Sequence, residues 1–263
     1  MSSIDEKRVY SATEGKTDVF VATGAGIAQV ECSGDLVGGF GLVRRCSARD
    51  IAANGDRLAV ATDEDVLVWS QDNDGFEPTG FGPASAVGYD DTVIAAGERG
   101  VARYDDSDWN TLSDLNNVRA IDGDLLAAAN GVYRFSGDGL TSVGLEDARD
   151  VSTAIVPLVA TAHGLYQLAN GWVNVLSGDV SLLASDGTYA HAVADEVLYV
   201  RDGGGDENEW RQVEIPVEER IAGIAYGASG TIYASTVDGT FLIGNDGWNT
   251  QPLGLPDVAG VAT

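Results

Sequence analysis

Arginine side chains are the groups of this sequence best suited to bind a charged partner. Two matching Ala-Arg-Asp triplets contain Arg49 and Arg149, each just before a short stretch that has the character of a strand. Arg119 and Arg220 lie near the start of similar stretches, and so does Arg8. A planar guanidinium holds carboxylate or phosphate oxygens through two parallel hydrogen bonds. These arginines are therefore candidates for an anion-binding site.

The same arginines can instead be neutralised within the protein. The acidic residues expected on the same face are Asp50, Asp63, Glu64, Asp65, Glu98, Asp150 and Asp238. Ion pairs with these carboxylates would leave a salt-bridged surface without a ligand. The register is a second open point, because Arg119 lies two positions deeper in its strand than Arg49 when Gly55 and Gly123 are aligned.

Histidine chemistry is limited to His163 and His191, the two histidines of the chain. A histidine pair without cysteines or a clear carboxylate cluster makes a poor zinc site. No Ser-His-Asp constellation can be singled out, and the glycine-rich passages lie in turns rather than before helices. His163 is expected in a hairpin turn on the side of the arginines, so it joins them as a candidate contact to a ligand or partner. The sequence assigns no catalytic residue and no metal ligand to this set.

These candidates are positioned by a hairpin that recurs along the chain. Leu125–Phe135 (LLAAANGVYRF) returns almost unchanged at Leu158–Leu168 (LVATAHGLYQL), and each copy is a strand, a tight turn at the glycine and a second strand. Seven copies follow one another at intervals of 31 to 43 residues. Their turns are anchored at Gly26, Asp65, Gly100, Gly131, Gly164, Glu196 and Gly239. The alternation of apolar and polar residues predicts strands throughout and no helix.

Each hairpin lies between two further strands. A short strand rich in small residues precedes it, and a polar turn with a fourth strand follows. That turn often ends in a large apolar residue, at Phe76, Trp109, Leu140, Trp172, Trp210 and Trp248. Four antiparallel strands repeated seven times predict an all-β, seven-bladed β-propeller that forms one domain over residues 1–263. The small strands would line the channel, and the large residues would pack between neighbouring blades.

A ring of blades must be closed, and the end of the chain offers a strand that could close it. Pro256–Thr263 (PDVAGVAT) has the character of one more inner strand beyond the seven hairpins. We predict that it joins the N-terminal blade, which removes both free sheet edges. Arg8–Gly15 would then be either the inner or an additional strand of that blade, and the sequence leaves both open. The loop into each inner strand and the turn of each hairpin open on one face, so the arginines are expected around the mouth of the channel.

The net charge restricts both the partners and the setting. Acidic residues number 41 and basic residues 15, which gives a net charge of −26, and Lys7 and Lys16 are the only lysines. High salt relieves self-repulsion at such a charge, so the composition predicts a halophilic, cytoplasmic protein. A strongly acidic surface argues against nucleic-acid binding. The apolar runs are too short to span a membrane. The N-terminus lacks the apolar core of a signal peptide. Cys32 and Cys46 are expected as free thiols, because a disulfide is not expected in a cytosolic protein.

Parts of the repeat resemble known propeller families. Ser136–Val143 (SGDGLTSV) and Asn245–Thr250 (NDGWNT) are degenerate relatives of the Asp-box of sialidase-like propellers, S-x-D-x-G-x-T-W. Over its whole length, and with its acidic composition, the chain is similar to a family of haloarchaeal β-propeller proteins. That resemblance implies the fold and the habitat, and it brings no catalytic residues.

Two functions are compatible with this sequence. The first, which we expect, is a non-catalytic binding or scaffold propeller that presents the arginine face to a protein or a small anion. The second is a hydrolase with its site in the channel, either sialidase-like, with three convergent arginines beside a Tyr/Glu pair, or a metal-dependent lactonase. Lactonase-like propellers hold Ca²⁺ with oxygen ligands. The candidates by position are Asn54, Asp90, Asp122, Asp150, Asp186 and Asp257.

Overall fold

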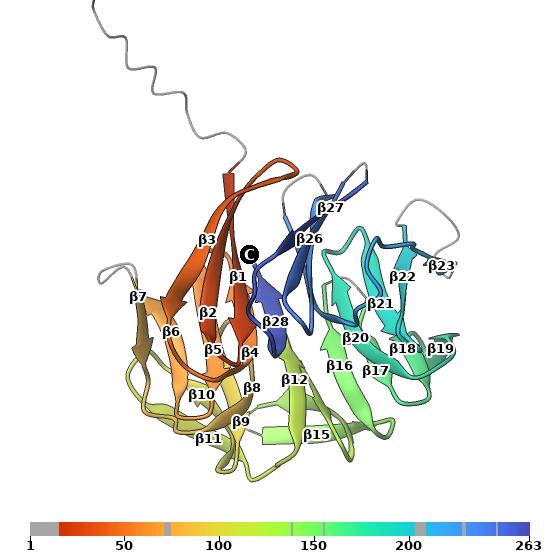
Figure 1. The fold of residues 1–263 in the computed structure, drawn as a ribbon. Coiled ribbons are helices and arrows are strands. Elements are labelled where there is room, and N and C mark those ends of the chain that lie inside the picture. The colour runs from red at the N-terminus through yellow and green to blue at the C-terminus, as the bar shows by residue number, and fades with distance from the viewer. Residues whose placement is uncertain are drawn as a thin grey trace, which may run out of the picture.

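The chain folds into a ring of seven antiparallel sheets with four strands each (Figure 1). The computed structural model describes residues 16–70, 75–137, 139–154, 156–202, 209–227, 230–245 and 247–263. The predicted all-β, seven-bladed propeller is confirmed.

We name the sheets blades A to G in chain order and give their strands from the channel outward. Blade A consists of β28 (Val258–Ala262), β1 (Lys16–Thr23), β2 (Gly26–Ser33) and β3 (Leu36–Arg44). Blade B consists of β4 (Ala48–Asn54), β5 (Arg57–Thr62), β6 (Val66–Ser70) and β7 (Gly75–Pro78). Blade C consists of β8 (Ala84–Asp90), β9 (Thr92–Gly97), β10 (Gly100–Tyr104) and β11 (Trp109–Ser113). Blade D consists of β12 (Val118–Asp122), β13 (Leu125–Ala128), β14 (Gly131–Ser136) and β15 (Gly139–Gly144).

Three further blades complete the ring. Blade E consists of β16 (Ala148–Ser152), β17 (Leu158–Thr161), β18 (Gly164–Leu168) and β19 (Trp172–Leu176). Blade F consists of β20 (Val180–Ser185), β21 (Ala190–Ala194), β22 (Val197–Arg201) and β23 (Arg211–Gln212). Blade G consists of β24 (Ile221–Tyr226), β25 (Ile232–Thr236), β26 (Thr240–Gly244) and β27 (Trp248–Pro252). The innermost strands contact one another in a closed cycle, in the order β28, β4, β8, β12, β16, β20, β24 and back to β28.

Blade A is built from both ends of the chain. β28 pairs antiparallel with β1, with Ala262 opposite Phe20 and Val258 opposite Thr23. Figure 1 shows the blue strand β28 next to the red strand β1. The predicted closure is therefore confirmed. Because β28 takes the inner position, the alternative in which Arg8–Gly15 is the inner strand is wrong, and those residues lie outside the described part of the chain.

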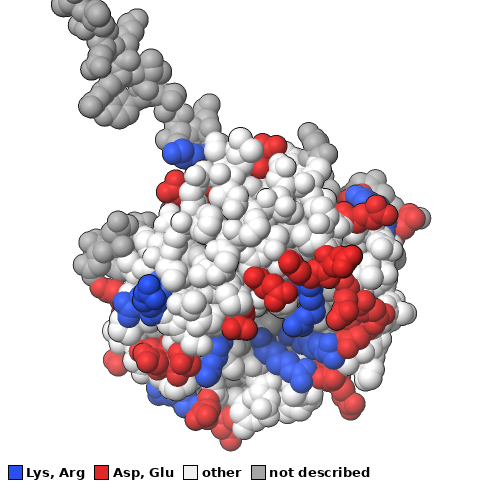
Figure 2. All heavy atoms as spheres, in the orientation of Figure 1, with Lys and Arg blue, Asp and Glu red and all other residues white. Residues whose placement is uncertain are grey.

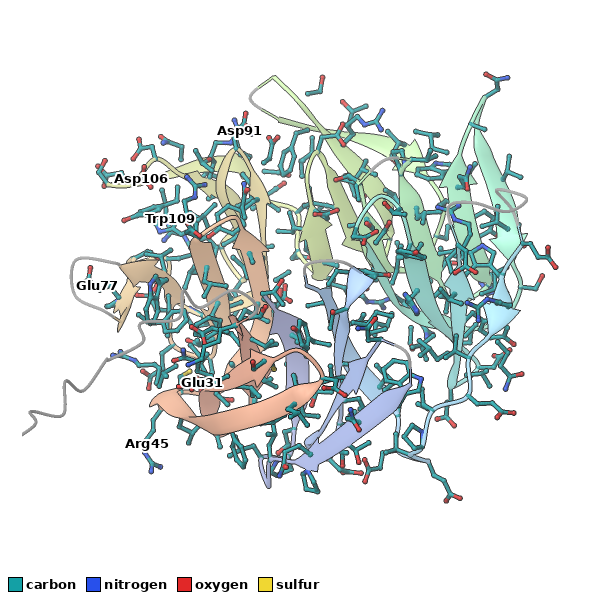
Figure 3. All side chains as sticks on the ribbon, turned by 90° about the horizontal axis from the view of Figure 1, so that it is seen from above. Glu31, Arg45, Glu77, Asp91, Asp106 and Trp109 are labelled. Carbon is teal, nitrogen blue, oxygen red and sulfur yellow. The ribbon has the colours of Figure 1, made fainter. Side chains whose placement is uncertain are left out.

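Apolar side chains pack between neighbouring blades rather than in one central core. The second strands β13 and β17 are buried along their whole length, because both of their faces lie against other blades. The Trp109 ring of blade C packs 4.7 Å from Phe81, and its indole N–H donates to Thr79 Oγ1 at 3.2 Å. In Figure 3, Trp109 lies at the border with blade B, on the side of Glu77. The predicted packing role of this repeat position is confirmed here.

The turns at the mouth of the ring are closed by buried threonines. In four blades the second strand ends in a buried threonine, and three of these, Thr23, Thr62 and Thr161, close the turn that follows. Each hydroxyl donates to the carbonyl three residues later, at 2.8, 2.7 and 2.9 Å. Each hydroxyl also accepts a backbone N–H of its turn, which satisfies groups that the strands leave unpaired.

In the described part of the chain, no helix has the length and apolar character needed to cross a membrane.

Close contact between inner strands demands small residues. A Cβ added to Gly88 of β8 would overlap the carbonyl oxygen of Ile121 in β12. We expect Gly88→Ala to lower the free energy of unfolding by about 1–3 kcal/mol, because the rigid backbone cannot make room for the methyl group. Gly41→Ala on the outer strand β3 is the matched control, since nothing lies within 4 Å of its added Cβ. Urea unfolding of both variants checks this, and equal losses would contradict the close packing of β8 against β12.

Candidate functional site

Every inner strand begins with the same irregularity. Its pairing with the next strand skips the second residue, which forms a β-bulge in all seven blades. A bulge redirects the side chain of the extra residue. Arg49, Arg119 and Arg149 occupy this position in β4, β12 and β16. The three arginines are therefore equivalent when the strands are aligned at their starts. The offset of Arg119 that appears when the glycines are aligned arises because β4 has two more residues than β12 before the turn.

Each of these arginines reaches toward the following blade. Arg49 Nη1 donates to the carbonyl of Ala84 at 3.3 Å, and no carboxylate of the described residues pairs with it. Arg119 donates to Asp147 Oδ1 at 2.5 Å and also to the carbonyl of Ala148. Arg149 pairs with Asp179. Two of the three arginines are thus neutralised within the protein, as the alternative expected, but by acids other than those predicted. The guanidinium of Arg49 can still bind the carboxylate or phosphate of a ligand or partner.

A groove of about 360 Å³ runs between Arg49 and Arg119. It crosses blade C, where the bulge position holds the short side chain of Ser85 instead of an arginine. The amide side chains of Asn116 and Asn117 also line it, and Glu98 is the acidic residue of its rim. Figure 2 shows basic side chains gathered around a hollow near the middle of one face, with many acidic side chains on the neighbouring surface. Positive charge is therefore concentrated at the channel mouth of a strongly acidic protein.

The other two predicted contacts lie on the same face but make no shared site with the groove. Arg220 is exposed and directly precedes β24, one residue before the strand start. His163 is exposed in the turn between β17 and β18, where its backbone N–H donates to Thr161 Oγ1. The hydrogen bond from Arg119 is the largest influence that lowers the pKa of Asp147, and the positive charge of His163 contributes. His163 therefore lies near the pair of Arg119 and Asp147.

The carboxylates of the Ala-Arg-Asp triplets do not pair with the arginines, contrary to the alternative considered above. Asp50 accepts the backbone N–H of Val87 at 2.9 Å, and Asp150 accepts that of Leu183 at 2.7 Å. Each also accepts the N–H of the residue that follows it, at 2.8 Å. Val87 and Leu183 belong to the next blade, so each carboxylate ties two neighbouring inner strands together. The sequence-based prediction missed this role of the two aspartates. The repeated Ala-Arg-Asp triplet is the sequence feature that could have pointed to it.

These two carboxylates line the central channel, a cavity of about 430 Å³. Burial within the ring raises the pKa of Asp50 and of Asp150 to about 7, and the accepted N–H bonds oppose that rise. Nearby negative charge adds to it, from Asp150 on Asp50 and from Asp122 on Asp150. The channel therefore contains two acids that change charge near neutral pH.

The candidate calcium ligands are spread along the channel. Those that line the cavity are Asp122, Asp150 and Asp186. Asp90 pairs with Arg103 at 2.6 Å, whereas Asn54 ends β4 and Asp257 precedes β28, at opposite ends of their inner strands. Among the described residues, no group of three or more His, Cys, Asp and Glu side chains is placed to hold a metal ion.

Fold and site together define a β-propeller whose channel mouth carries arginines from three blades. Residues 3–263 match the family model described as HVO_0234-like, beta propeller. The chain belongs to this family. No curated protein matches the sequence.

Solved structures similar to this chain include two β-propeller domains and a lyase. The WD40 β-propeller domain of Doa1 shares 18% identity over 82% of this chain and 85% of its own, with a TM-score of 0.65. The β-propeller domain of Cps50 (Swd1) from Myceliophteria thermophila shares 13% identity over 82% and 89%, with a TM-score of 0.59. Virginiamycin B lyase from Staphylococcus aureus shares 10% identity over 80% and 85%, with a TM-score of 0.63. At such identities the likeness concerns the fold alone.

Proposed function

We propose that this chain is a non-catalytic binding propeller that holds an acidic group of its partner in the groove between Arg49 and Arg119. The partner is a protein with exposed carboxylates or phosphates, or a small anion of the same chemistry. The observation that carries the proposal is the exposed guanidinium of Arg49, which bonds to a backbone carbonyl and has no carboxylate partner among the described residues. A carboxylate or phosphate can complete its hydrogen bonding bidentately.

The surroundings of the groove support an acidic partner. Arg119 flanks it from the opposite side, and the asparagine amides add neutral donors at its edge. The net charge of −26 makes a nucleic acid an unsuitable partner for the protein as a whole, and it suits a cytosol of high salt, in which long-range repulsion is screened. Under such screening the affinity depends on short-range contacts, which are those that the groove provides.

The test compares a double variant of the groove with a control variant outside it. Tagged protein is used to capture partners from an extract of its own cells in molar KCl, and each captured partner is then titrated against the purified variants by calorimetry. We expect Arg49→Ala combined with Arg119→Ala to weaken binding at least about tenfold, because each lost charged hydrogen bond contributes about 1.5–3 kcal/mol. Arg134→Ala is the control, because Arg134 and Asp124 form a similarly exposed ion pair at the other end of blade D. A partner that binds all variants equally would overturn the proposal.

A further inference from the structure

Strand β3, the outer strand of blade A, is an exposed and apolar sheet edge. With nine residues it is the longest outer strand in the described part of the chain. Five large apolar side chains are exposed among the described residues, and three of them belong to β3. These are Leu36 at 65%, Phe40 at 44% and Val43 at 42% exposure. The edge therefore offers apolar surface together with the unpaired N–H and C=O groups of a free strand.

The composition of β3 differs from that of the other outer strands. From Leu36 to Val43 it has no charged and no polar side chain, in a chain with 41 acidic residues. In Figure 2 the upper part of the molecule, where Figure 1 places β3, shows few charged side chains. Polar or charged side chains occur on all the other outer strands, which are β7, β11, β15, β19, β23 and β27. Charged side chains commonly protect a free edge against pairing with another chain, and β3 lacks this protection.

The backbone of β3 is accessible because the strand is rich in glycine. A Cβ added to Gly39 or Gly41 would meet nothing within 4 Å. A cavity of about 400 Å³ lies beside these glycines, with Gln29 and Glu31 of β2 in its lining. Glycines inside a strand often mark a place where another backbone approaches closely. A further strand can therefore come up to β3 without steric hindrance.

Two bulges define the part of this edge that is regular. Gly38 and Val43 are the extra residues of β3, and Gly39–Leu42 between them pairs regularly with β2. Counted from the two-residue turn Gly34–Asp35, Phe40 occupies a position without hydrogen bonds to β2. Its N–H and C=O therefore point to the free edge. Phe40 is the centre from which a further strand can pair with this segment.

Opposite charges lie at the two ends of β3. Asp35 directly precedes the strand, and Arg44 and Arg45 lie at its end. All three side chains are exposed, and none forms an ion pair with another described residue. Figure 3 shows Arg45 projecting outward from the ring, and the hydrogen-bond donor to the Asp35 carboxylate is the neutral side chain of Asn249. An antiparallel copy of the same strand would bring a positive end against a negative end twice.

We propose that β3 pairs with β3 of a second copy of this chain, antiparallel about a two-fold axis through Phe40. The two Phe40 rings then lie side by side, and Gly39 lies opposite Gly41 of the partner subunit. The same register places Arg45 opposite Asp35 of the partner subunit, and the symmetry repeats this contact. A single pair of strands is a small interface, so the dimer is reversible. The contact shares no residue with the groove at the channel mouth, so it is independent of the function proposed above.

Sedimentation velocity of the full chain over a wide range of protein concentrations tests the proposal. We expect an equilibrium between monomer and dimer that Phe40→Lys weakens at least about tenfold, because two lysines would face each other at the axis. Val173→Lys is the matched control, since Val173 is 52% exposed on the outer strand of blade E, and it should leave the equilibrium unchanged. The mass of a single chain at every concentration would overturn the proposal.

Exchange of the end charges tests the antiparallel arrangement. Asp35→Arg and Arg45→Asp should each weaken the dimer about tenfold in sub-molar KCl, because like charges then face each other at both ends. Asp35→Arg makes the chain less negative, so general repulsion predicts the opposite result for this variant. An equimolar mixture of the two variants should associate as tightly as the wild type, since the mixed dimer has opposite charges at both ends. A mixture that associates no better than either variant alone would overturn the proposal.

The alternative occupant of the edge is the segment of residues 1–15 of the same chain. A chain that begins at Lys16 keeps all 28 strands and distinguishes the two occupants. We expect it to dimerise as the full chain does, and circular dichroism shows whether it and the other variants are folded. Dimerisation of the shortened chain but not of the full chain would assign the edge to residues 1–15 and overturn the proposal.

Discussion

A chain that ends at Leu255 should fail to form the native ring. Removal of Pro256–Thr263 deletes β28, so β1 loses its inner partner and blade A loses the contacts that β28 makes with β4 and β24. Val258 and Val261 belong to the core shared with blade G, and Ala262 to the core shared with blade B. Burial of a valine contributes about 1.5–3 kcal/mol, so the loss approaches the total stability of a typical domain, about 5–15 kcal/mol. The exposed edge of β1 then invites association with other chains.

Size-exclusion chromatography and circular dichroism in molar KCl measure this outcome. We expect the shortened chain to be aggregated or unfolded, while a chain shortened by Thr263 alone keeps the elution volume and the spectrum of the full chain, because it keeps every residue of β28. Addition of a synthetic peptide of residues 256–263 should restore part of the native signal, since the peptide can pair with β1 in the register of Ala262 opposite Phe20. A shortened chain with the elution volume and the spectrum of the full chain would show that contacts between blades suffice and that strand closure is dispensable.

Repetition made the architecture readable from the sequence. The near-identical hairpins Leu125–Phe135 and Leu158–Leu168 identify the repeated hairpin of a blade. Their shared residues mark the positions of its two strands and of the turn between them. The small residues of the inner strands and the apolar tail after Leu255 follow from the same pattern. The structure confirms these elements because each depends on contacts that recur in every blade. The same residue pattern therefore appears several times in the sequence.

The site was less predictable because it depends on differences between blades. The equivalence of Arg49 and Arg119 is set by bulges at the strand starts, whereas the glycines that suggested an offset follow strands of unequal length. The partners of Asp50 and Asp150 lie in the next blade, so their bonds depend on how neighbouring sheets are rotated.

The channel carboxylates should make the protein less stable as the pH rises from about 4 to about 7. Asp50 and Asp150 titrate near 7 in the folded state, whereas an unfolded aspartate titrates near 3.9. The native state therefore holds more protons than the unfolded chain throughout this window, and the free energy of unfolding falls with increasing pH. A tenfold difference in acidity between the folded and the unfolded state corresponds to about 1.4 kcal/mol, so the two groups together contribute on the order of several kcal/mol. Other acids act in the opposite sense at lower pH, since hydrogen bonds lower the pKa of Asp105 and Asp147.

Urea unfolding at about pH 5 and about pH 8 in molar KCl separates this effect from the general repulsion of a charge of −26, which salt screens. The double variant with Asp50→Asn and Asp150→Asn cannot titrate in the channel, so its free energy of unfolding should change much less between the two pH values. Each asparagine keeps one acceptor for the N–H of Val87 or Leu183 and loses the other, so the variant should be the less stable protein at about pH 5. The matched control Asp90→Asn alters a carboxylate that is paired with Arg103, and it should keep the wild-type dependence on pH. If the double variant kept that dependence too, the ties between neighbouring inner strands would be charged over the whole range, and the two carboxylates would act as fixed acceptors rather than as groups that couple the stability of the ring to pH.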